Sequence, residues 1–214
     1  MIQFYTIKGA GRLTSCIGPC LWFFEEIDLK YQLIQIDLTK NENKGRLYLH
    51  INPNGKIPAL NDDGFILSES SAINFYIAEK YKPEFLGSTL SEKTNITQWI
   101  LWSITQFEPY VASLFINATK PFDERDIQDI QISKFKITEY TNLLNNHLKS
   151  NKFIAGDKMS LADIHLASFM HIHSILHTQI SAFNNFKRWY QSMMSREALK
   201  KLENKKLLTL SQTI

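Results

Sequence analysis

Two different spacings of apolar residues divide the chain near residue 85. Before that point, short apolar or alternating runs at 3–7, 31–38, 57–60 and 65–67 predict β-strands, and helical spacing lies between several of them. The Asn-Asp-Asp-Gly turn at 61–64 is typical of a hairpin that joins two strands. The order β-α-β-α-β-β-α predicts a mixed four-stranded sheet with helices packed on it.

A turn-rich segment that contains Pro83 and Gly87 is the candidate linker between two domains. Beyond it, the apolar residues keep the three- and four-residue spacing of helices. The chain is therefore expected to divide into an α/β domain over residues 1–81 and an all-α domain over residues 88–214.

Long helices are predicted around 96–115, 130–148 and 161–176. The last of these is so apolar that it should be central and buried. Pro109 is expected to kink the first one, because proline removes a backbone hydrogen bond and crowds the preceding turn.

Composition narrows the class of protein. The chain has 214 residues, 44% of them apolar, which is enough for two small domains with buried cores. The net charge is only +3 and the lysines are scattered, so a nucleic-acid partner is not expected. Cys16 and Cys20 are too few for a disulfide framework or a zinc site. No apolar run approaches the ~20 residues that cross a bilayer, and the N-terminus lacks the signal-peptide pattern, so we expect a cytoplasmic protein without a membrane partner.

The stretch Asn-Pro-Asn-Gly-Lys-Ile-Pro-Ala-Leu at 52–60 places Pro58 directly before a predicted strand. Proline in this position favours a rigid turn and is compatible with a cis bond. The backbone N–H and C=O of Ile57 would then be open to an extended peptide ligand, as in strand addition. Taken alone, a loop with two prolines and a glycine is the simpler interpretation.

Glu69 and Ser70 stand at the predicted start of a helix. The carboxylate can bind an amine, and the serine hydroxyl together with the first N–H groups can bind a carboxylate at the positive end of the helix. The pair therefore fits the two charges at the amino-acid end of a peptide ligand. By itself it is also an ordinary helix cap.

Thr14, Ser15 and Cys16 lie in a loop that runs into a predicted helix. Oriented N–H groups at a helix start stabilise a thiolate, either of the protein or of a bound substrate. Cys16 is therefore a candidate reactive thiol, and Ser15 or Thr14 could donate a hydrogen bond to a bound thiolate. The alternative is an inert, half-buried Cys16. Cys20, one turn later among apolar residues, is expected in the core.

The most apolar predicted helix carries four histidines, of which His173 and His177 are four residues apart. That spacing can hold a metal ion, but no cysteine or carboxylate pattern accompanies it. We therefore expect no metal site and interpret these residues as buried or interface histidines. The four histidines are His165, His171, His173 and His177.

Together, the Asn-Pro-x-Gly-x-Ile-Pro-x-Leu stretch, the Glu-Ser pair and a capping box from Ser160 to Asp163 resemble the glutathione transferase family, in particular its bacterial beta-like members. The motifs fall in the family's order and spacing, and the resemblance covers most of the chain. It implies a thioredoxin-like N-terminal domain that binds glutathione and a helical-bundle C-terminal domain that contributes the second-substrate site.

The resemblance also implies roles for residues of the N-terminal domain. The residue before the cis-proline pairs with the cysteinyl backbone of glutathione in the family, which corresponds to Ile57 and Pro58 here. Glu69 and Ser70 correspond to the pair that binds the γ-glutamyl group. Tyr5 falls where beta-like members have a tyrosine near the site.

In beta-like members a cysteine lies at the start of the first helix, and the Thr-Ser-Cys-Ile stretch here matches it at Cys16. The loop at 7–13 is longer than is usual in the family. Glu108 stands where those members have a histidine that faces the glutathione sulfur. A carboxylate there would disfavour a thiolate, so either the chemistry differs or Glu108 points elsewhere. Phe107 and Tyr110 are the aromatic residues expected to contact the second substrate.

The resemblance therefore implies an enzyme that uses glutathione as co-substrate, without another cofactor. It would transfer the glutathione thiolate to hydrophobic electrophiles or disulfides, and conjugation, peroxide reduction and disulfide exchange all stay open. Family members usually form homodimers. The alternative is a non-enzymatic binding or regulatory protein with the same fold, since a fold does not determine a function. The presence of both the Ile57-Pro58 and the Glu69-Ser70 elements favours the enzyme.

Overall fold

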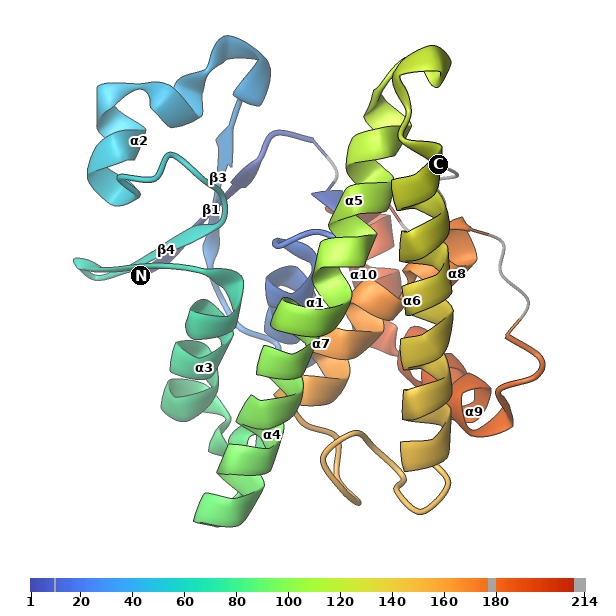
Figure 1. Cartoon of the computed structure of the whole chain (residues 1–214). Helices are drawn as coiled ribbons and strands as arrows, with labels where there is room; N and C mark the ends of the chain where they lie inside the picture. Colours follow the sequence, from blue (N-terminus) through green and yellow to red (C-terminus); the bar gives the residue numbers. More distant parts are fainter. Residues whose placement is uncertain (10, 177–179, 210–214) are drawn as a thin grey trace. The chain divides into compact units, whose positions relative to one another are not determined.

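The computed structural model describes residues 1–9, 11–176 and 180–209. It divides into two compact units. Figure 1 shows the chain coloured by residue number, from blue at the N-terminus to red at the C-terminus. The N-terminal unit contains Met1–Pro83 together with the described residues from Arg196 onward, and the helical unit contains Glu84–Ser195.

A four-stranded mixed sheet forms the framework of the N-terminal unit. In spatial order, its strands are β3 (Gln32–Ile36), β1 (Ile2–Ile7), β4 (Ala59–Asp62) and β5 (Phe65–Ser68). β1 runs parallel to β3 and antiparallel to β4, and β4 and β5 form a hairpin. The mixed sheet and the hairpin predicted from the sequence are confirmed.

Helices lie on both faces of this sheet. Phe4 of β1 packs edge-on against Phe24 of α1 (Gly18–Glu26), with ring centroids 5.0 Å apart. α3 (Ser70–Tyr81) packs against α1 and against the β4–β5 hairpin. The next residue of β1, Tyr5, faces the opposite way, because neighbouring residues of a strand alternate between faces. There its ring lies 6.0 Å from that of Tyr48 in α2 (Arg46–Ile51).

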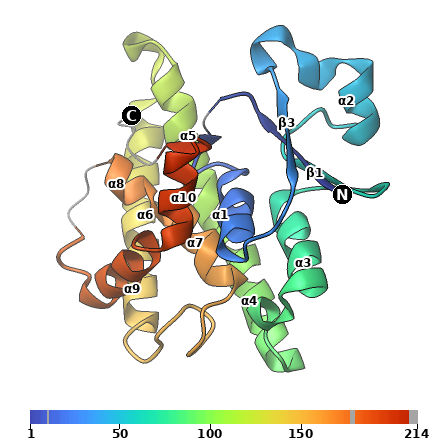
Figure 2. The same cartoon turned by 180° about the vertical axis from the view of Figure 1, so that it is seen from behind.

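The last described helix belongs to the N-terminal unit. α10 (Glu197–Asn204) packs against α1, as Figure 2 shows, and α1 is therefore buried on all sides from Gly18 to Glu25. Strand β6 (Leu208–Thr209) then pairs in parallel with β2 (Gly11–Arg12), just before α1. This differs from the assignment of the whole range 88–214 to the helical domain, because contacts with α1 outweigh closeness in the sequence.

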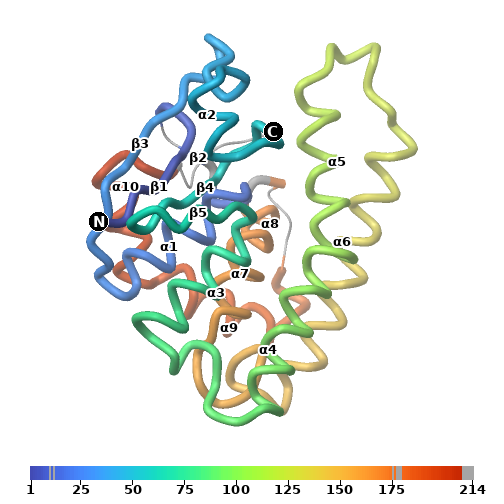
Figure 3. The backbone as a smooth tube through the Cα atoms, turned by 90° about the vertical axis from the view of Figure 1, so that its left-hand side faces the viewer, coloured from blue at the N-terminus to red at the C-terminus, as the bar shows by residue number. Residues whose placement is uncertain are grey.

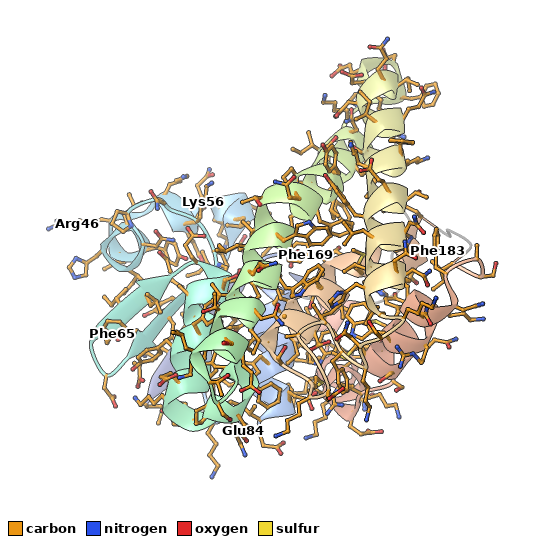
Figure 4. All side chains as sticks on the ribbon, turned by 60° about the horizontal axis from the view of Figure 1, so that its bottom comes forward. Arg46, Lys56, Phe65, Glu84, Phe169 and Phe183 are labelled. Carbon is orange, nitrogen blue, oxygen red and sulfur yellow. The ribbon has the colours of Figure 1, made fainter. Side chains whose placement is uncertain are left out.

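The helical unit is built around one buried helix. Every residue of α7 is buried, as its apolar sequence predicted, and Phe169 in Figure 4 is one of them. α5 and α6 lie side by side in Figure 3. No helix in the described ranges is long and apolar enough to cross a membrane. The helices of this unit are α4 (Leu90–Trp102), α5 (Glu108–Thr119), α6 (Ile127–His147), α7 (Leu161–Met170), α8 (Ile172–Ile175) and α9 (Asn184–Met194).

The kink predicted at Pro109 takes the form of a π-helical turn. α4 passes into this turn at Ser103–Phe107 and continues as α5 from Glu108. Pro109 cannot donate a backbone hydrogen bond, and its ring crowds the carbonyl four residues earlier. The wider π turn relieves both problems without ending the helix.

Candidate functional site

The loop before β4 is held by two hydrogen bonds to one carbonyl. Asn52 Nδ2 and the Tyr48 hydroxyl donate to the carbonyl of Lys56 at 2.7 and 2.6 Å. The next peptide bond, between Ile57 and Pro58, is cis. Among the described residues, the backbone N–H and C=O of Ile57 have no hydrogen-bond partner. An extended ligand could therefore pair with this edge.

Glu69 has an unusual backbone conformation at the start of α3. Its φ of 69° and ψ of 117° lie outside the regions that residues with a side chain normally adopt, at a cost of roughly 1–3 kcal/mol. Its carboxylate is exposed and makes no capping hydrogen bond to α3. Strain of this kind concentrates at ligand sites, and here it coincides with the residue expected to bind an amine.

The start of α3 also holds an unpaired polar atom. The Oγ of Ser71 is buried and has no hydrogen-bond partner among the described residues. A buried hydroxyl without a partner costs about 1–3 kcal/mol, and a ligand at this helix start could supply one. Sequence reasoning missed Ser71, although the run Ser-Glu-Ser-Ser at 68–71 offered a second hydroxyl beside the half-buried Ser70.

These two elements lie at the same end of the β4–β5 hairpin. Ala59 pairs with Ser68 in the antiparallel register. The residues just before Ala59 and just after Ser68 are therefore neighbours at one edge of the sheet. A ligand paired with Ile57 lies within reach of Glu69 and the first N–H groups of α3.

The predicted thiol loop adjoins this edge through Cys20. Its Sγ donates to the carbonyl of Ser70 at 3.4 Å, which holds the start of α1 against the start of α3. In the turn before α1, Cys16 is exposed and Ser15 is half-buried. Thr14 is buried, and its Oγ1 has no partner within the described part of the chain. The structure thus places the start of α1, which directly follows the thiol loop, beside the start of α3.

The two cysteines have different surroundings. Burial raises the pKa of the Cys20 thiol well above its usual value, with a smaller contribution from Cys16. Cys20 is therefore a core residue, as expected, and a poor nucleophile. Cys16 directly precedes Ile17, the N-cap residue of α1, where backbone N–H groups favour a thiolate. Exposure and position both make Cys16 the better candidate for chemistry.

Tyr5 lies on the face of the sheet that α2 covers. Phe4 faces α1, whereas Tyr5 faces α2, where its hydroxyl donates to Gln3 Oε1 at 3.4 Å. Tyr5 therefore lies beside Tyr48, whose hydroxyl holds the carbonyl of Lys56 directly before Ile57. The expectation that Tyr5 lies near bound glutathione stays a prediction.

In the helical unit, Glu108 is bound by side chains of that unit. Its Oε1 lies 2.6 Å from Nε2 of His165 and accepts a hydrogen bond from the Ser103 hydroxyl at 3.1 Å. His165 belongs to α7 and Ser103 to the π turn, and both are buried. The Glu108 carboxylate, which was expected to disfavour a thiolate, is thus bonded to the His165 and Ser103 side chains of its own unit.

The expectation that Phe107 contacts the second substrate is wrong. It is fully buried, with its ring stacked on Trp102 at 6.5 Å and edge-on to Tyr140 at 6.4 Å. It therefore packs inside the helical unit and offers no surface to a substrate. Tyr110 is half-buried, with its ring 6.1 Å from that of Tyr140, so part of it stays accessible.

Three of the four histidines lie in the described residues, and His177 lies outside them. Each of the three is buried and within hydrogen-bond distance of a polar side chain: His165 of Glu108, His171 of Tyr190, and His173 of Thr141. No group of three metal-binding side chains occurs in the described part of the chain.

Comparison with known proteins gives matches over both units. The family description "Glutathione S-transferase, N-terminal domain" matches residues 15–79, and "Glutathione S-transferase, C-terminal domain" matches residues 103–197. Glutathione S-transferase F12 of Arabidopsis thaliana is 31% identical over 206 residues, which cover 92% of this chain and 96% of that protein.

A bacterial protein and a solved structure are also similar. The disulfide-bond oxidoreductase YfcG of Escherichia coli strain K12 is 29% identical over 185 residues, which cover 82% of this chain and 84% of that protein. The structure of glutathione S-transferase-I bound with lactoylglutathione has a TM-score of 0.83 and 26% identity, over 95% of this chain and 98% of that one.

These similarities correct one expectation and confirm others. The plant F-type transferases among the relatives do not support the bacterial beta-like subgroup, although YfcG is bacterial. The relatives support glutathione conjugation or thiol exchange, and they do not support the non-enzymatic alternative. Since both domains match and a relative above 30% identity spans nearly the whole chain, the chain belongs to the glutathione S-transferase family.

Proposed function

We propose that this transferase works chiefly by thiol–disulfide exchange through Cys16. The observation that carries the proposal is the exposed Cys16 in the turn before α1, beside the start of α3. An exposed cysteine at a helix start has the surroundings of a reactive thiolate. The name of the related YfcG, a disulfide-bond oxidoreductase, supports exchange over conjugation as the main reaction.

In this proposal, glutathione lies extended along the edge before β4. Its cysteinyl backbone pairs with the N–H and C=O of Ile57, beside Pro58. Its γ-glutamyl amine binds the Glu69 carboxylate, and its γ-glutamyl carboxylate binds Ser70 and the first N–H groups of α3. The buried Oγ of Ser71 adds one hydroxyl at that helix start. Glutathione is the co-substrate, and the proposal includes no other cofactor.

The exchange has two balanced steps. The Cys16 thiolate attacks the glutathione sulfur of a mixed disulfide, which forms a disulfide between Cys16 and glutathione and releases the other sulfur as a thiolate. A glutathione thiolate then attacks the glutathione sulfur of this adduct, which gives glutathione disulfide and restores the Cys16 thiolate. Ser15 or Thr14 donates a hydrogen bond to the thiolate. Conjugation of an electrophile would use the same stabilised glutathione thiolate.

Calorimetric titration with reduced glutathione tests binding, and turnover of a small glutathione mixed disulfide tests the reaction. Glu69→Ala should weaken binding about 10-fold or more, since it removes a charge-assisted hydrogen bond. Cys16→Ser should abolish exchange and keep binding, whereas the matched control Cys20→Ser should keep both. Undiminished exchange in Cys16→Ser would refute the role of Cys16, and no binding at millimolar glutathione would refute the whole proposal.

The proposal also covers the second substrate, the oligomeric state and the location in the cell, all three of which are suggested by family membership. The second substrate is a hydrophobic electrophile or disulfide that contacts Tyr110, with Phe107 only supporting the packing behind it. The protein is a cytoplasmic homodimer. Analytical ultracentrifugation tests the dimer, and a substrate screen with Tyr110→Ala tests the contact.

A further inference from the structure

The C-terminal end of the described chain returns to the loop that carries Cys16. Lys206, with a φ of 55°, ends α10 and turns the chain toward β2. β6 then pairs with β2 in parallel, with Leu208 opposite Gly11. The N–H of Gly11 donates to the carbonyl of Leu207 at 2.9 Å. The long stretch between β1 and α1 is thus the part of the N-terminal unit that binds the C-terminal strand.

Ion pairs between α10 and α1 hold this segment in place. Arg196 and Glu26 form a bidentate pair, and Lys205 donates to both oxygens of Glu25 at 2.7 and 2.8 Å. The carboxylates of Glu26 and Glu25 are only 9% and 7% exposed, so either one would be costly to leave unpaired. Figure 2 shows α10 in red beside α1 in blue.

Gly11 is the contact point between the C-terminal strand and the thiol loop. A side-chain carbon on Gly11 would lie 2.2 Å from Cδ1 of Ile17 and 3.5 Å from Cδ2 of Leu208. Ile17 and Leu208 are both buried. The Ile17 side chain therefore lies directly on the backbone of Gly11, with Leu208 beside it. Ile17 is the residue that follows Cys16.

Cys16 and Ile17 are the two central residues of a tight turn. The N–H of Gly18 donates to the carbonyl of Ser15 at 3.0 Å, which closes the turn. Gly18 also lies so near the carbonyl of Leu13 that an added carbon would be 2.0 Å from its oxygen. Ile17 points into the core and Cys16 points to the surface. Because the two residues share one closed turn, a displacement of Ile17 also moves the Cys16 thiol.

We propose that Leu208 is a positioning residue for Cys16: the C-terminal strand holds Ile17 against Gly11 and thereby fixes the turn that presents the thiol at the start of α1. This inference rests on the proposed role of Cys16 in thiol exchange. Leu208 contacts neither the sulfur nor glutathione in this proposal, and it acts through Ile17.

The test measures how fast iodoacetamide alkylates Cys16 as a function of pH, in Leu208→Ala and in Leu199→Ala. Leu199 is a buried leucine of α10, so both variants remove the same atoms from the C-terminal segment. Leu208→Ala should slow alkylation at pH 7 by roughly 5-fold or more and move the midpoint of the pH profile upward. It should also lower kcat of thiol exchange and leave KM for glutathione unchanged. Leu199→Ala should keep the wild-type profile.

Two further variants separate positioning of Cys16 from a general loss of folding. Leu208→Met preserves apolar volume and should restore the wild-type profile. Gly11→Ala displaces Ile17 from the opposite side and should slow alkylation even where Leu208→Ala folds poorly. Wild-type pH profiles in both Leu208→Ala and Gly11→Ala would overturn the proposal. Retained exchange in Cys16→Ser would instead refute the proposed function, and the alkylation profiles would still report on positioning.

Discussion

Cys16 and Cys20 lie one helical turn apart in the chain, and only Cys16 is exposed. The Cys20 thiol donates to the carbonyl of Ser70 inside the core, and burial raises its pKa. We predict that iodoacetamide labels Cys16 at neutral pH at least about 10-fold faster than Cys20. Peptide mass spectrometry measures both rates, and the urea-unfolded chain, where the two should react alike, is the control. Comparable rates in the native protein would contradict the buried position of Cys20.

His173 is a second residue whose burial has a measurable consequence. The Thr141 hydroxyl donates to the carbonyl of Ile137, so it accepts from His173 Nε2 at 2.7 Å. His173 Nδ1 is then a buried acceptor without a partner among the described residues. Burial lowers the pKa of His173 from 6.5 to about 4. Above pH 6.5 the ring is neutral in both the folded and the unfolded chain, and the folded chain has its full stability. Between pH 6.5 and pH 4 the unfolded chain binds a proton that the folded chain does not, so the unfolding free energy falls.

We predict that His173 alone makes the wild-type chain lose up to about 3 kcal/mol of unfolding free energy between pH 6.5 and pH 4. His173→Gln cannot titrate and should lose correspondingly less over this interval. Urea unfolding at a series of pH values measures the difference. His50→Gln, at an exposed histidine, is the matched control for the substitution itself. Parallel curves for wild type and His173→Gln would rule this explanation out.

At the scale of elements, the Glu108 carboxylate joins the π turn, the start of α5 and α7. Glu108→Ala leaves His165 and Ser103 buried without this partner and should lower the unfolding free energy by about 2–3 kcal/mol. Glu108→Gln should lose less, because its amide can still bond to both groups. Chemical unfolding measures the losses, with Glu124→Ala, at an exposed glutamate, as the control.

The same variants separate a structural role of Glu108 from a role toward the ligand. Glu108 is bonded to Ser103 and His165 of its own unit, so Glu108→Ala should leave glutathione affinity within roughly 2-fold of wild type. A large change in affinity with unchanged stability would mean that this carboxylate acts on the ligand and not on the packing of its helices.

Local patterns predicted the elements and missed how some of them pack. The alternating runs and the Asn-Asp-Asp-Gly turn at 61–64 were sufficient to predict the strands, the hairpin and the mixed sheet, because each of these signals lies within a short segment of the chain. Pro109 showed that the long helix is disturbed, but a kink and a π turn have the same sequence signal. Phe107 was misjudged because helical spacing does not tell which face is covered, and Tyr140 covers it from α6.

At the scale of the whole molecule, the N-terminal unit is built from two segments at opposite ends of the chain. The sequence motifs around Ile57, Glu69 and Cys16 are local, so they could be found without a structure. The pairing of Gly11 with Leu208 depends on two residues far apart in the sequence, and neither carries a motif. The place of α10 and the pairing of β6 with β2 were therefore beyond sequence reasoning.

The pair Glu26–Arg196 tests how the two segments are joined. The residues are 170 positions apart, and their side chains are 9% and 35% exposed. Glu26→Arg or Arg196→Glu alone brings like charges together at a largely buried position and should lower the unfolding free energy by about 2–4 kcal/mol. The double variant restores opposite charges and should recover at least about 1 kcal/mol of the summed loss. Chemical unfolding of the four proteins gives this coupling energy.

Hydrogen exchange then locates the effect. Because Glu26 and Arg196 both belong to the N-terminal unit, each single variant should speed exchange in α1 and β2 and leave α6 and α7 protected. Purely additive losses in the double variant would mean that α10 is held by its apolar face alone. Faster exchange spread evenly over α1, α6 and α7 would mean that the two units unfold together, so that the C-terminal segment stabilises the whole protein and not one unit.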